Sequence, residues 1–176
     1  MASTPGPRFP LVQLTSRHDV RGFTSGKHPG SLEIDEYLKT VALAEQAAGL
    51  SQVWIALDSE APSSDENVAA YFTLSPLSIP LTPAVLDMLG LGSVPYRAVG
   101  GYLLGRLGVA ARLQGQDLGS VLIAAAIKIA RRARTDVGGV FLAVDPKNDK
   151  LLAWYQRLDF GFQRLDAGKR RIVLKL

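Results

Sequence analysis

The segment between residues 102 and 144 constrains the fold most, because strand, turn, helix and strand patterns follow one another there without a break. The strand Tyr102–Val109 leads into the polar turn 111–117, and an apolar helix is expected from about Leu118 to Arg134. The strand Val140–Val144 comes next. This order predicts an α/β fold with a central mixed sheet and helices on both of its faces.

The helix expected over residues 118–134 has one apolar face. Its apolar residues recur at spacings of three and four, which is the period of a helix that packs one side against a core. The predicted inner face consists of Leu118, Val121, Leu122, Ala125 and Ile129.

The first half of the chain predicts three more strands and two helices. The strands are expected over residues 9–15, 53–57 and 68–74. A helix is expected from Leu32, with Ser31 as its N-cap and Gly49 at its end. Thr82 and Pro83 are typical of the start of a shorter helix that ends near Gly90.

After the central segment, the pattern predicts a helix and two closing strands. The helix carries Leu151, Leu152, Trp154 and Tyr155, and the strands are expected over residues 161–165 and 170–176. No repeat or change of composition marks a boundary, so a single domain is expected over residues 1–176.

Composition excludes several classes of protein. The 176 residues contain no cysteine, so disulfides, thiolate metal sites and a cysteine nucleophile are all excluded, and no metal is expected. No apolar run is long enough to span a membrane, and the first residues lack a secretion pattern, so a cytoplasmic protein is expected. The net charge of +4 permits an anionic partner.

The turn Gln114–Ser120 joins a strand to the start of a helix. Backbone N–H groups at such a turn are left unpaired and, together with the helix dipole, favour a phosphate. The spacing matches neither a Walker A loop nor a dinucleotide fingerprint. From the turn alone, a plain connection is the more common explanation.

In its context the turn resembles motif A of the GNAT superfamily of N-acetyltransferases, Gln/Arg-x-x-Gly-x-Gly/Ala. Asp117 departs from that pattern, because it stands where the family has glycine; it could oppose a pyrophosphate or stabilise the helix start. The resemblance implies acetyl-CoA as cosubstrate. The residues that it places against acetyl-CoA in this segment are Gln114, Gly115, Gln116, Leu118, Gly119 and Ser120.

The stretch Asn148–Phe162 resembles motif B of the same superfamily. Asn148 and Tyr155 coincide with the motif, whereas Asp159 again takes the place of a glycine. The resemblance implies that Asn148 helps to bind the cofactor and that Tyr155 is catalytic. Without it, Tyr155 is interpreted as a core aromatic of an amphipathic helix.

Further segments are similar to the toxin branch of this superfamily, which occurs in bacterial toxin–antitoxin pairs. They are residues 21–38, 70–75 and 104–109, and the resemblance reaches from about residue 11 to residue 176. This branch acetylates the α-amine of an amino acid esterified to tRNA. As partners of this chain, the resemblance implies aminoacyl-tRNA, a small DNA-binding antitoxin and a second copy of the chain.

The superfamily fold implies a largely antiparallel mixed sheet with one splayed strand pair. Backbone at Leu107 and Val109 would bind the pantetheine arm, and the Val109 N–H would stabilise the oxyanion. Tyr155 would protonate the leaving thiolate in a direct transfer. Gly108 is explained by the splay or by a strand bulge.

The sequence offers no obvious general base, since His18 and His28 both fall in expected loops. An α-amine has a pKa of about 7.7–8.0 and the lysine side chain one of about 10.4. An α-amine acceptor is therefore less dependent on a general base than a lysine acceptor is.

A tRNA partner requires basic residues that contact phosphate. The alternative explanation is helix capping for the cluster at 131–134 and a solvated turn for residues 169–171. The candidates are Arg106, Arg131, Arg132, Arg134, Lys169, Arg170 and Arg171.

Three functions remain open from the sequence. The first is a toxin that acetylates aminoacyl-tRNA and blocks translation. The second is a housekeeping acetyltransferase for a small amine or a protein N-terminus. The third is a catalytically silent binding module of the same fold, in which Asp117 has abolished acetyl-CoA binding.

Overall fold

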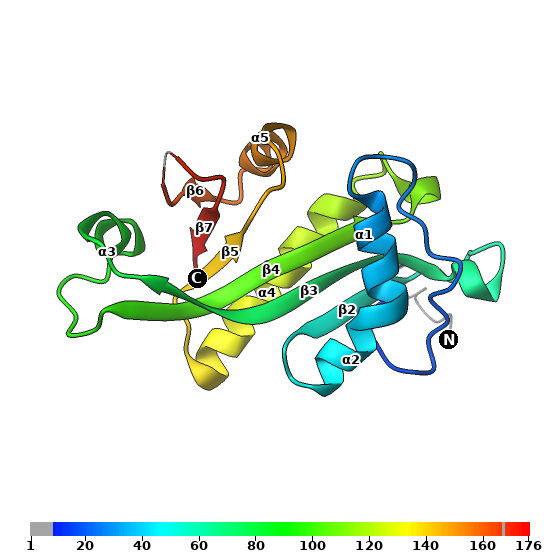
Figure 1. The fold of residues 1–176 in the computed structure, drawn as a ribbon, viewed down its shortest axis with the longest axis horizontal. Coiled ribbons are helices and arrows are strands. Elements are labelled where there is room, and N and C mark those ends of the chain that lie inside the picture. Colours follow the sequence, from blue (N-terminus) through cyan, green and yellow to red (C-terminus); the bar gives the residue numbers. More distant parts are fainter. Residues whose placement is uncertain (1–8, 167) are drawn as a thin grey trace, which may run out of the picture. The chain divides into compact units, whose positions relative to one another are not determined.

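A computed structural model describes residues 9–166 and 168–176, and these form two compact units. The first contains residues 9–73 and Arg106–Leu122; the second contains Leu74–Gly105 and Ile123–Leu176. The two long strands β3 (Val68–Pro80) and β4 (Ala98–Val109) contribute to both units (Figure 1). Each unit has its own cluster of buried apolar side chains.

The strands form one hydrogen-bonded sheet in the order β1-β2-β3-β4-β5-β7-β6. Its strands are β1 (Leu11–Gln13), β2 (Gln52–Leu57), β3, β4, β5 (Phe141–Val144), β6 (Gln163–Arg164) and β7 (Ile172–Lys175). The β4–β5 pair is parallel, and β1–β2, β5–β7 and β6–β7 are antiparallel. The prediction of a mixed α/β sheet is therefore confirmed.

Helices and short helical turns occupy the connections between strands. They are α1 (Ser31–Glu36), the π-helix η1 (Tyr37–Val41), α2 (Ala42–Ala47), the 3-10 turns η2 (Ser64–Glu66) and η3 (Ala111–Leu113), α3 (Pro83–Leu89), α4 (Leu118–Val137) and α5 (Asp149–Arg157). In the described part of the chain, no helix is both long and apolar enough to cross a membrane.

The helix predicted from Leu32 to Gly49 is interrupted by the π-helix η1. A π-turn inserts one residue, which rotates the following residues by about 100° around the axis. Ala42 is consequently buried, whereas Val41, which the regular helical period places inside, is 38% exposed. Ser31 is not the N-cap: Gly30, with φ of 89°, precedes the helix, and Ser31 is its buried first residue.

The core of the first unit lies between these helices and the strands that precede and follow them. Its buried members come from β2, β3, η1, α2, the segment between β1 and α1, and Ala110 directly after β4. Among them Tyr71 packs edge-on against Phe23, with 5.5 Å between ring centroids, and stacks on Tyr37 at 6.3 Å. The Tyr71 hydroxyl donates a hydrogen bond to the Ile34 carbonyl at 2.7 Å. The polar tip of this aromatic core is thereby satisfied.

The second unit contains α3, whose predicted ends are confirmed. The Thr82 hydroxyl accepts the Val85 N–H at 3.3 Å, and Pro83 occupies the first turn. Gly90 ends the helix with φ of 61°, a conformation that glycine adopts without steric cost. Val85 and Leu89 thereby reach the apolar cluster of this unit.

The buried face of α4 differs from the prediction at three positions, because Val121 is exposed and Ala125 and Ile129 are only half-buried. Leu118 and Leu122 are buried as expected, but Val121 is 58% exposed, so its placement on the inner face was wrong. The helical period around Leu118 and Leu122 selects a different set of neighbours. They are Ile123, Ala126, Ile127 and Ala130.

Several strands differ in length from their predictions: β1 and β7 are shorter, β4 begins earlier at Ala98, and β3 and β6 also differ. β3 continues six residues beyond Leu74 to Pro80, through a segment whose prolines argue against a strand. β6 is only two residues long, where a strand over residues 161–165 was predicted. Extension by pairing with a long neighbour, here β4, overrides the local signal in β3.

Candidate active site

The turn Gln114–Ser120 lies in the first unit; it comprises the connection between η3 and α4 and the first three residues of α4. Its backbone turns sharply because Gly115 has φ of 78° and Asp117 has φ of 56°. The first hydrogen bond of α4 joins the Val121 N–H to the Asp117 carbonyl at 3.2 Å, and the Ser120 hydroxyl donates to the same carbonyl. The turn is thus fixed by the helix that it begins.

The backbone N–H groups from Gly115 to Ser120 make no hydrogen bond to any residue that the structure describes. All of these residues except Leu118, Gly119 and Ser120 are exposed, so the donors are accessible. A row of unpaired N–H groups at the start of a long helix binds an anion such as a pyrophosphate. The turn therefore fits the phosphates of coenzyme A.

Gln114 shapes this turn through its side chain. The Gln114 Nε2 donates to the Ser25 carbonyl at 2.7 Å and to the Val109 carbonyl at 3.2 Å. Ser25 is itself held by the buried Asp35, which accepts its N–H at 2.8 Å and its hydroxyl at 2.7 Å. The side chain of Gln114 is thus engaged within the protein, and its predicted contact with acetyl-CoA remains a prediction.

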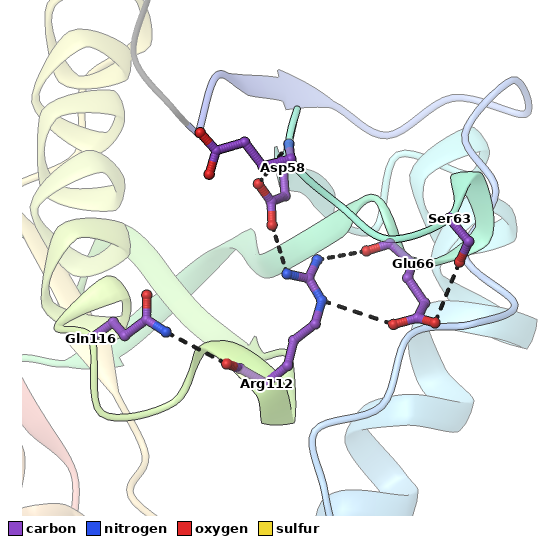
Figure 2. A network of polar contacts seen from close by, with 6 residues as sticks. Asp58, Ser63, Glu66, Arg112 and Gln116 are labelled. Carbon is purple, nitrogen blue, oxygen red and sulfur yellow. Dashed lines mark hydrogen bonds and ion pairs between the residues drawn. The ribbon is translucent and has the colours of Figure 1, made fainter.

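Arg112 anchors the residues just before the turn (Figure 2). Its Nη1 donates to the buried Asp58 carboxylate at 2.6 Å, and its Nη2 donates to the Glu66 carbonyl at 2.7 Å. This contact was not predicted, because Asp58 and Arg112 lie far apart in the chain. An acid directly after a buried strand was the one signal available for it.

The strand β4 loses its parallel partner before it ends. The pairing with β5 stops where Leu104 lies opposite Val144. The Arg106 N–H donates to the Thr73 side-chain hydroxyl at 3.0 Å, and the Ala110 N–H donates to the Ala69 carbonyl at 2.8 Å; both acceptors belong to β3. Because N–H groups alternate in direction along a strand, those of Leu107 and Val109 point to the opposite edge, beyond the β5 pairing. The contacts of Leu107 and Val109 with the pantetheine arm remain a prediction.

Gly108 is explained by close packing. A Cβ atom there would lie 2.6 Å from the Ile34 Cγ2 and 2.9 Å from the Tyr71 Cε1. Neither the splay nor a bulge is needed to account for this glycine.

Tyr155 lies on α5 in the second unit. Its ring packs edge-on against Trp154 at 4.9 Å and Phe162 at 6.1 Å between centroids. Burial raises the pKa of the Tyr155 hydroxyl above its ordinary value, because the phenolate would lose its hydration. No hydrogen bond engages this hydroxyl among the described residues. Tyr155 is thus a neutral O–H donor with its proton available.

Asn148 caps α5. Its Oδ1 accepts the Leu151 N–H at 2.9 Å, and its backbone is extended as an N-cap requires. One polar atom of Asn148 is therefore used by the helix, and the predicted cofactor contact of this residue is untested.

The predicted basic residues differ in their partners. In the second unit, Arg132 pairs with Asp136 and Arg134 donates to the carbonyl of Leu176. In the hairpin that closes the chain, acids also neutralise two of the three predicted cations. Arg170 binds Asp149 at 2.8 Å and Arg171 binds Asp145 at 2.6 Å.

Arg106, in the first unit, is held by an aromatic ring. Its guanidinium lies 3.8 Å from the centroid of the Tyr37 ring, which is a cation–π contact. The Tyr37 hydroxyl donates to Glu45 at 2.8 Å, so the acid lies at the far end of the ring. No carboxylate pairs with Arg106 in the described part of the chain. Its charge is therefore held in place without being neutralised.

The two histidines serve their own loops. The His18 Nδ1 accepts the Thr15 N–H at 3.0 Å. The His28 Nδ1 lies 3.2 Å from the Pro29 carbonyl. Neither arrangement marks a general base.

Asp117 and Asp159 share one backbone feature. They are the non-glycine residues with positive φ in the described chain, at 56° and 54°. Both stand where the GNAT motifs have glycine. The backbone has thus kept the left-handed conformation while the side chain changed, which is tolerable because aspartate adopts this conformation more readily than most residues.

Comparison with known proteins extends these observations. Three similar solved structures are a Tyr-to-Phe mutant of KacT, AtaT complexed with acetyl-methionyl-tRNAfMet, and AtaTR bound with AcCoA. Their TM-scores are 0.79, 0.76 and 0.74, at 21%, 22% and 23% identity. The alignments cover 96%, 95% and 96% of this chain and 95%, 94% and 94% of the other chains. The fold is thus shared over nearly the whole chain.

The fold and the turn of unpaired N–H groups fit an acyl-CoA-dependent acyltransferase. Residues 41–162 match the acetyltransferase (GNAT) family. The chain belongs to this family, and it is an N-acetyltransferase with acetyl-CoA as its cosubstrate.

Proposed function

We propose that this acetyltransferase is a toxin that acetylates the α-amine of aminoacyl-tRNA and thereby blocks translation. The observation that carries the proposal is the extent of the structural likeness to the AtaT and KacT chains, which includes the N-terminal segment outside the family match. AtaT is the neighbour complexed with acetyl-methionyl-tRNAfMet.

The acceptor chemistry agrees with this proposal. Neither histidine is placed as a base, and an α-amine is partly neutral near pH 7.5 without one. The α-amine forms the new C–N bond while the thioester C–S bond breaks, and its proton passes to water. Tyr155 gives its proton to the departing sulfur and regains one from water. Acetyl-CoA supplies the activated acetyl group.

The residues proposed to bind acetyl-CoA follow the family motifs. The turn would hold the pyrophosphate through its unpaired N–H groups, and the open edge of β4 would pair with the pantetheine arm. Gln114 would act through the shape of the turn. The full set is Leu107, Val109, Gln114, Gly115, Gln116, Leu118, Gly119, Ser120 and Asn148.

For tRNA, we propose Arg106 as the principal phosphate contact. Its guanidinium is ordered by Tyr37 and its charge is not paired with a carboxylate in the described chain. Arg170 and Arg171, by contrast, must first break their ion pairs with Asp149 and Asp145 before they can bind phosphate. The remaining candidates, Arg131, Arg132, Arg134 and Lys169, are proposed as weaker contacts.

The wider assignments follow from the same proposal. A tRNA-acetylating toxin acts in the cytoplasm and needs an antitoxin that holds it silent, for which we propose a small DNA-binding protein. We further propose a homodimer, and that residues 1–176 act as one catalytic domain.

Induced expression tests this function. Production of the wild-type chain should arrest growth, and Tyr155→Phe, which removes only the hydroxyl, should abolish the arrest. Trp154→Phe, on the same helix, is the matched control and should keep it. Harmless expression of the wild-type chain would instead support a housekeeping acetyltransferase.

A further inference from the structure

We infer that Arg112 is the positioning residue of the phosphate-binding turn: it ties the turn to the connection between β2 and β3 and so sets the affinity for the pyrophosphate of acetyl-CoA. This inference rests on the assignment of the turn Gln114–Ser120 to acetyl-CoA proposed above. With Gly115 and Asp117 at the glycine positions, the pattern Gln/Arg-x-x-Gly-x-Gly/Ala begins at Arg112, but the pattern does not say what this side chain contacts.

The Arg112 guanidinium binds acceptors within the protein. Its three nitrogen atoms all face the β2–β3 connection: Nη1 contacts Asp58 at 2.6 Å, Nη2 the Glu66 carbonyl at 2.7 Å, and Nε the Glu66 Oε2 at 4.0 Å (Figure 2). The Asp58 side chain is fully buried, whereas the Arg112 side chain is 28% exposed, so the acid of this pair is shielded from water. A planar guanidinium that bridges two acceptors fixes both its position and its orientation.

The connection that receives Arg112 is itself ordered. The Asp58 N–H donates to the Asn67 carbonyl at 2.7 Å, which closes the connection at its base. Asp58 Oδ1 also accepts the Glu60 N–H at 3.1 Å, and the Ser63 hydroxyl donates to Glu66 at 3.3 Å. Arg112 is therefore tied to a braced support.

Arg112 is separated from the turn by only one residue, so fixing its position also restricts the backbone of the turn. Arg112 is the middle residue of η3, and the Gln114 N–H donates to the Ala111 carbonyl at 3.3 Å. The Gln116 side chain returns to the Arg112 carbonyl at 3.5 Å. The unpaired N–H groups begin at Gly115, so the anchor lies immediately before the donors that need alignment.

This arrangement distinguishes positioning from direct binding. A cation near a phosphate-binding turn is usually taken as a phosphate ligand, but the donors of Arg112 are already engaged with Asp58 and Glu66. Its effect on the pyrophosphate must pass through the backbone. A preorganised set of N–H groups binds an anion better than a mobile set, because less order is lost on binding.

Calorimetric titration of the full chain with two ligands tests the inference. Acetyl-CoA contains the pyrophosphate, whereas acetylpantetheine keeps the thioester and the pantetheine arm but lacks it. The variants are Arg112→Gln, Arg112→Lys and the double variant Asp58→Asn/Arg112→Gln, which removes the buried Asp58 charge together with its partner. Arg21→Gln, which breaks an exposed pair with Asp19 in the same unit, is the matched control.

Arg112→Gln should weaken acetyl-CoA binding about tenfold or more and leave acetylpantetheine binding within about twofold. Arg112→Lys should restore only part of the affinity, because an ammonium cannot bridge Asp58 and Glu66. The double variant should recover thermal stability, since no unpaired charge stays buried, yet keep the weakened acetyl-CoA binding. Arg21→Gln should change neither.

Three results would overturn the inference. They are equal weakening of both ligands by Arg112→Gln, unchanged acetyl-CoA binding, and recovery of acetyl-CoA affinity together with stability in the double variant. The last would show that Arg112 acts through folding alone. A wild-type chain that binds acetyl-CoA but does not acetylate aminoacyl-tRNA would refute the proposed acceptor and leave these comparisons intact.

Discussion

Replacing Asp117 by glycine should tighten acetyl-CoA binding. Asp117 is exposed, lies in the phosphate-binding turn and has φ of 56°. Glycine restores the residue that the family has at this position and adopts the same φ without steric cost. The substitution therefore removes a negative charge from the turn while the backbone keeps its conformation.

The size of the effect follows from Coulomb's law. A carboxylate about 6 Å from a pyrophosphate, in a dielectric constant of about 80, repels it by about 0.7 kcal/mol per charge. Two phosphate charges give about 1.4 kcal/mol, which corresponds to roughly a tenfold lower Kd at low ionic strength. Salt screens exposed charges, so the gain should shrink as the ionic strength rises.

Stability should change little in the same variant. Glycine relieves the left-handed strain, but it also makes the unfolded chain more flexible, by about 0.5–1 kcal/mol. Loss of the acid at the start of α4 removes a further ~0.3–1 kcal/mol of helix-dipole stabilisation. These effects nearly cancel, so the free energy of unfolding should stay within about 1 kcal/mol of the wild type.

Two further variants separate charge from backbone. Asp117→Asn removes the charge and keeps a residue that tolerates positive φ, so it should give the same gain in affinity. Asp159→Gly makes the same backbone change at φ of 54° in the other unit and should leave the Kd unchanged. Titration calorimetry with acetyl-CoA measures all three. Unchanged affinity in both Asp117 variants would refute the electrostatic argument.

Other predictions concern packing, proton donation and tRNA. Gly108→Ala should lower the free energy of unfolding by ~1–3 kcal/mol and the unfolding temperature by several degrees, because the new Cβ overlaps Ile34 and Tyr71. Gly100→Ala, which is also on β4 but has open space around it, is the control. Equal melting curves for the two variants would contradict the packing argument. Because burial raises the pKa of Tyr155, its ionisation should not reduce kcat below about pH 10; a loss of activity near pH 8 that is assigned to this hydroxyl would contradict its burial. Arg106→Gln should weaken tRNA binding and reduce the slope of its salt dependence by about one phosphate contact. Joint replacement of residues 169–171 by alanine should reduce that slope by less than three contacts, because Asp149 and Asp145 compete with tRNA phosphates for Arg170 and Arg171. A full loss of three contacts would show that these acids do not compete.

Much of the fold could be predicted because the local signals agree with the tertiary structure. Thr82, Pro83 and Gly90 define α3 through capping chemistry that acts within a few residues. The buried positions of α4 needed more than periodicity, since Val121 fits the apolar pattern and is nevertheless exposed. The π-helix η1 could not be predicted, because the packing of Tyr37 and Leu38 decides where the extra residue enters.

The site divides in the same way. The turn, Tyr155 and the cap Asn148 carry signals in the sequence itself. Arg112 and Arg106 depend on partners 54 and 69 residues away, Asp58 and Tyr37, and no local pattern reveals such pairs. The aspartates that replace glycine became intelligible only with their φ angles.

The proposed function requires that this acetyltransferase modify aminoacyl-tRNA with Tyr155 as the proton donor. The most direct measurement is mass spectrometry of the amino acids released from a mixed aminoacyl-tRNA pool after incubation with the chain and acetyl-CoA, with Tyr155→Phe alongside. We expect N-acetylated amino acids with the wild type and their loss in the Tyr155→Phe variant. An absence of acetylated amino acids from a chain that binds acetyl-CoA, or an equal yield from Tyr155→Phe, would contradict it.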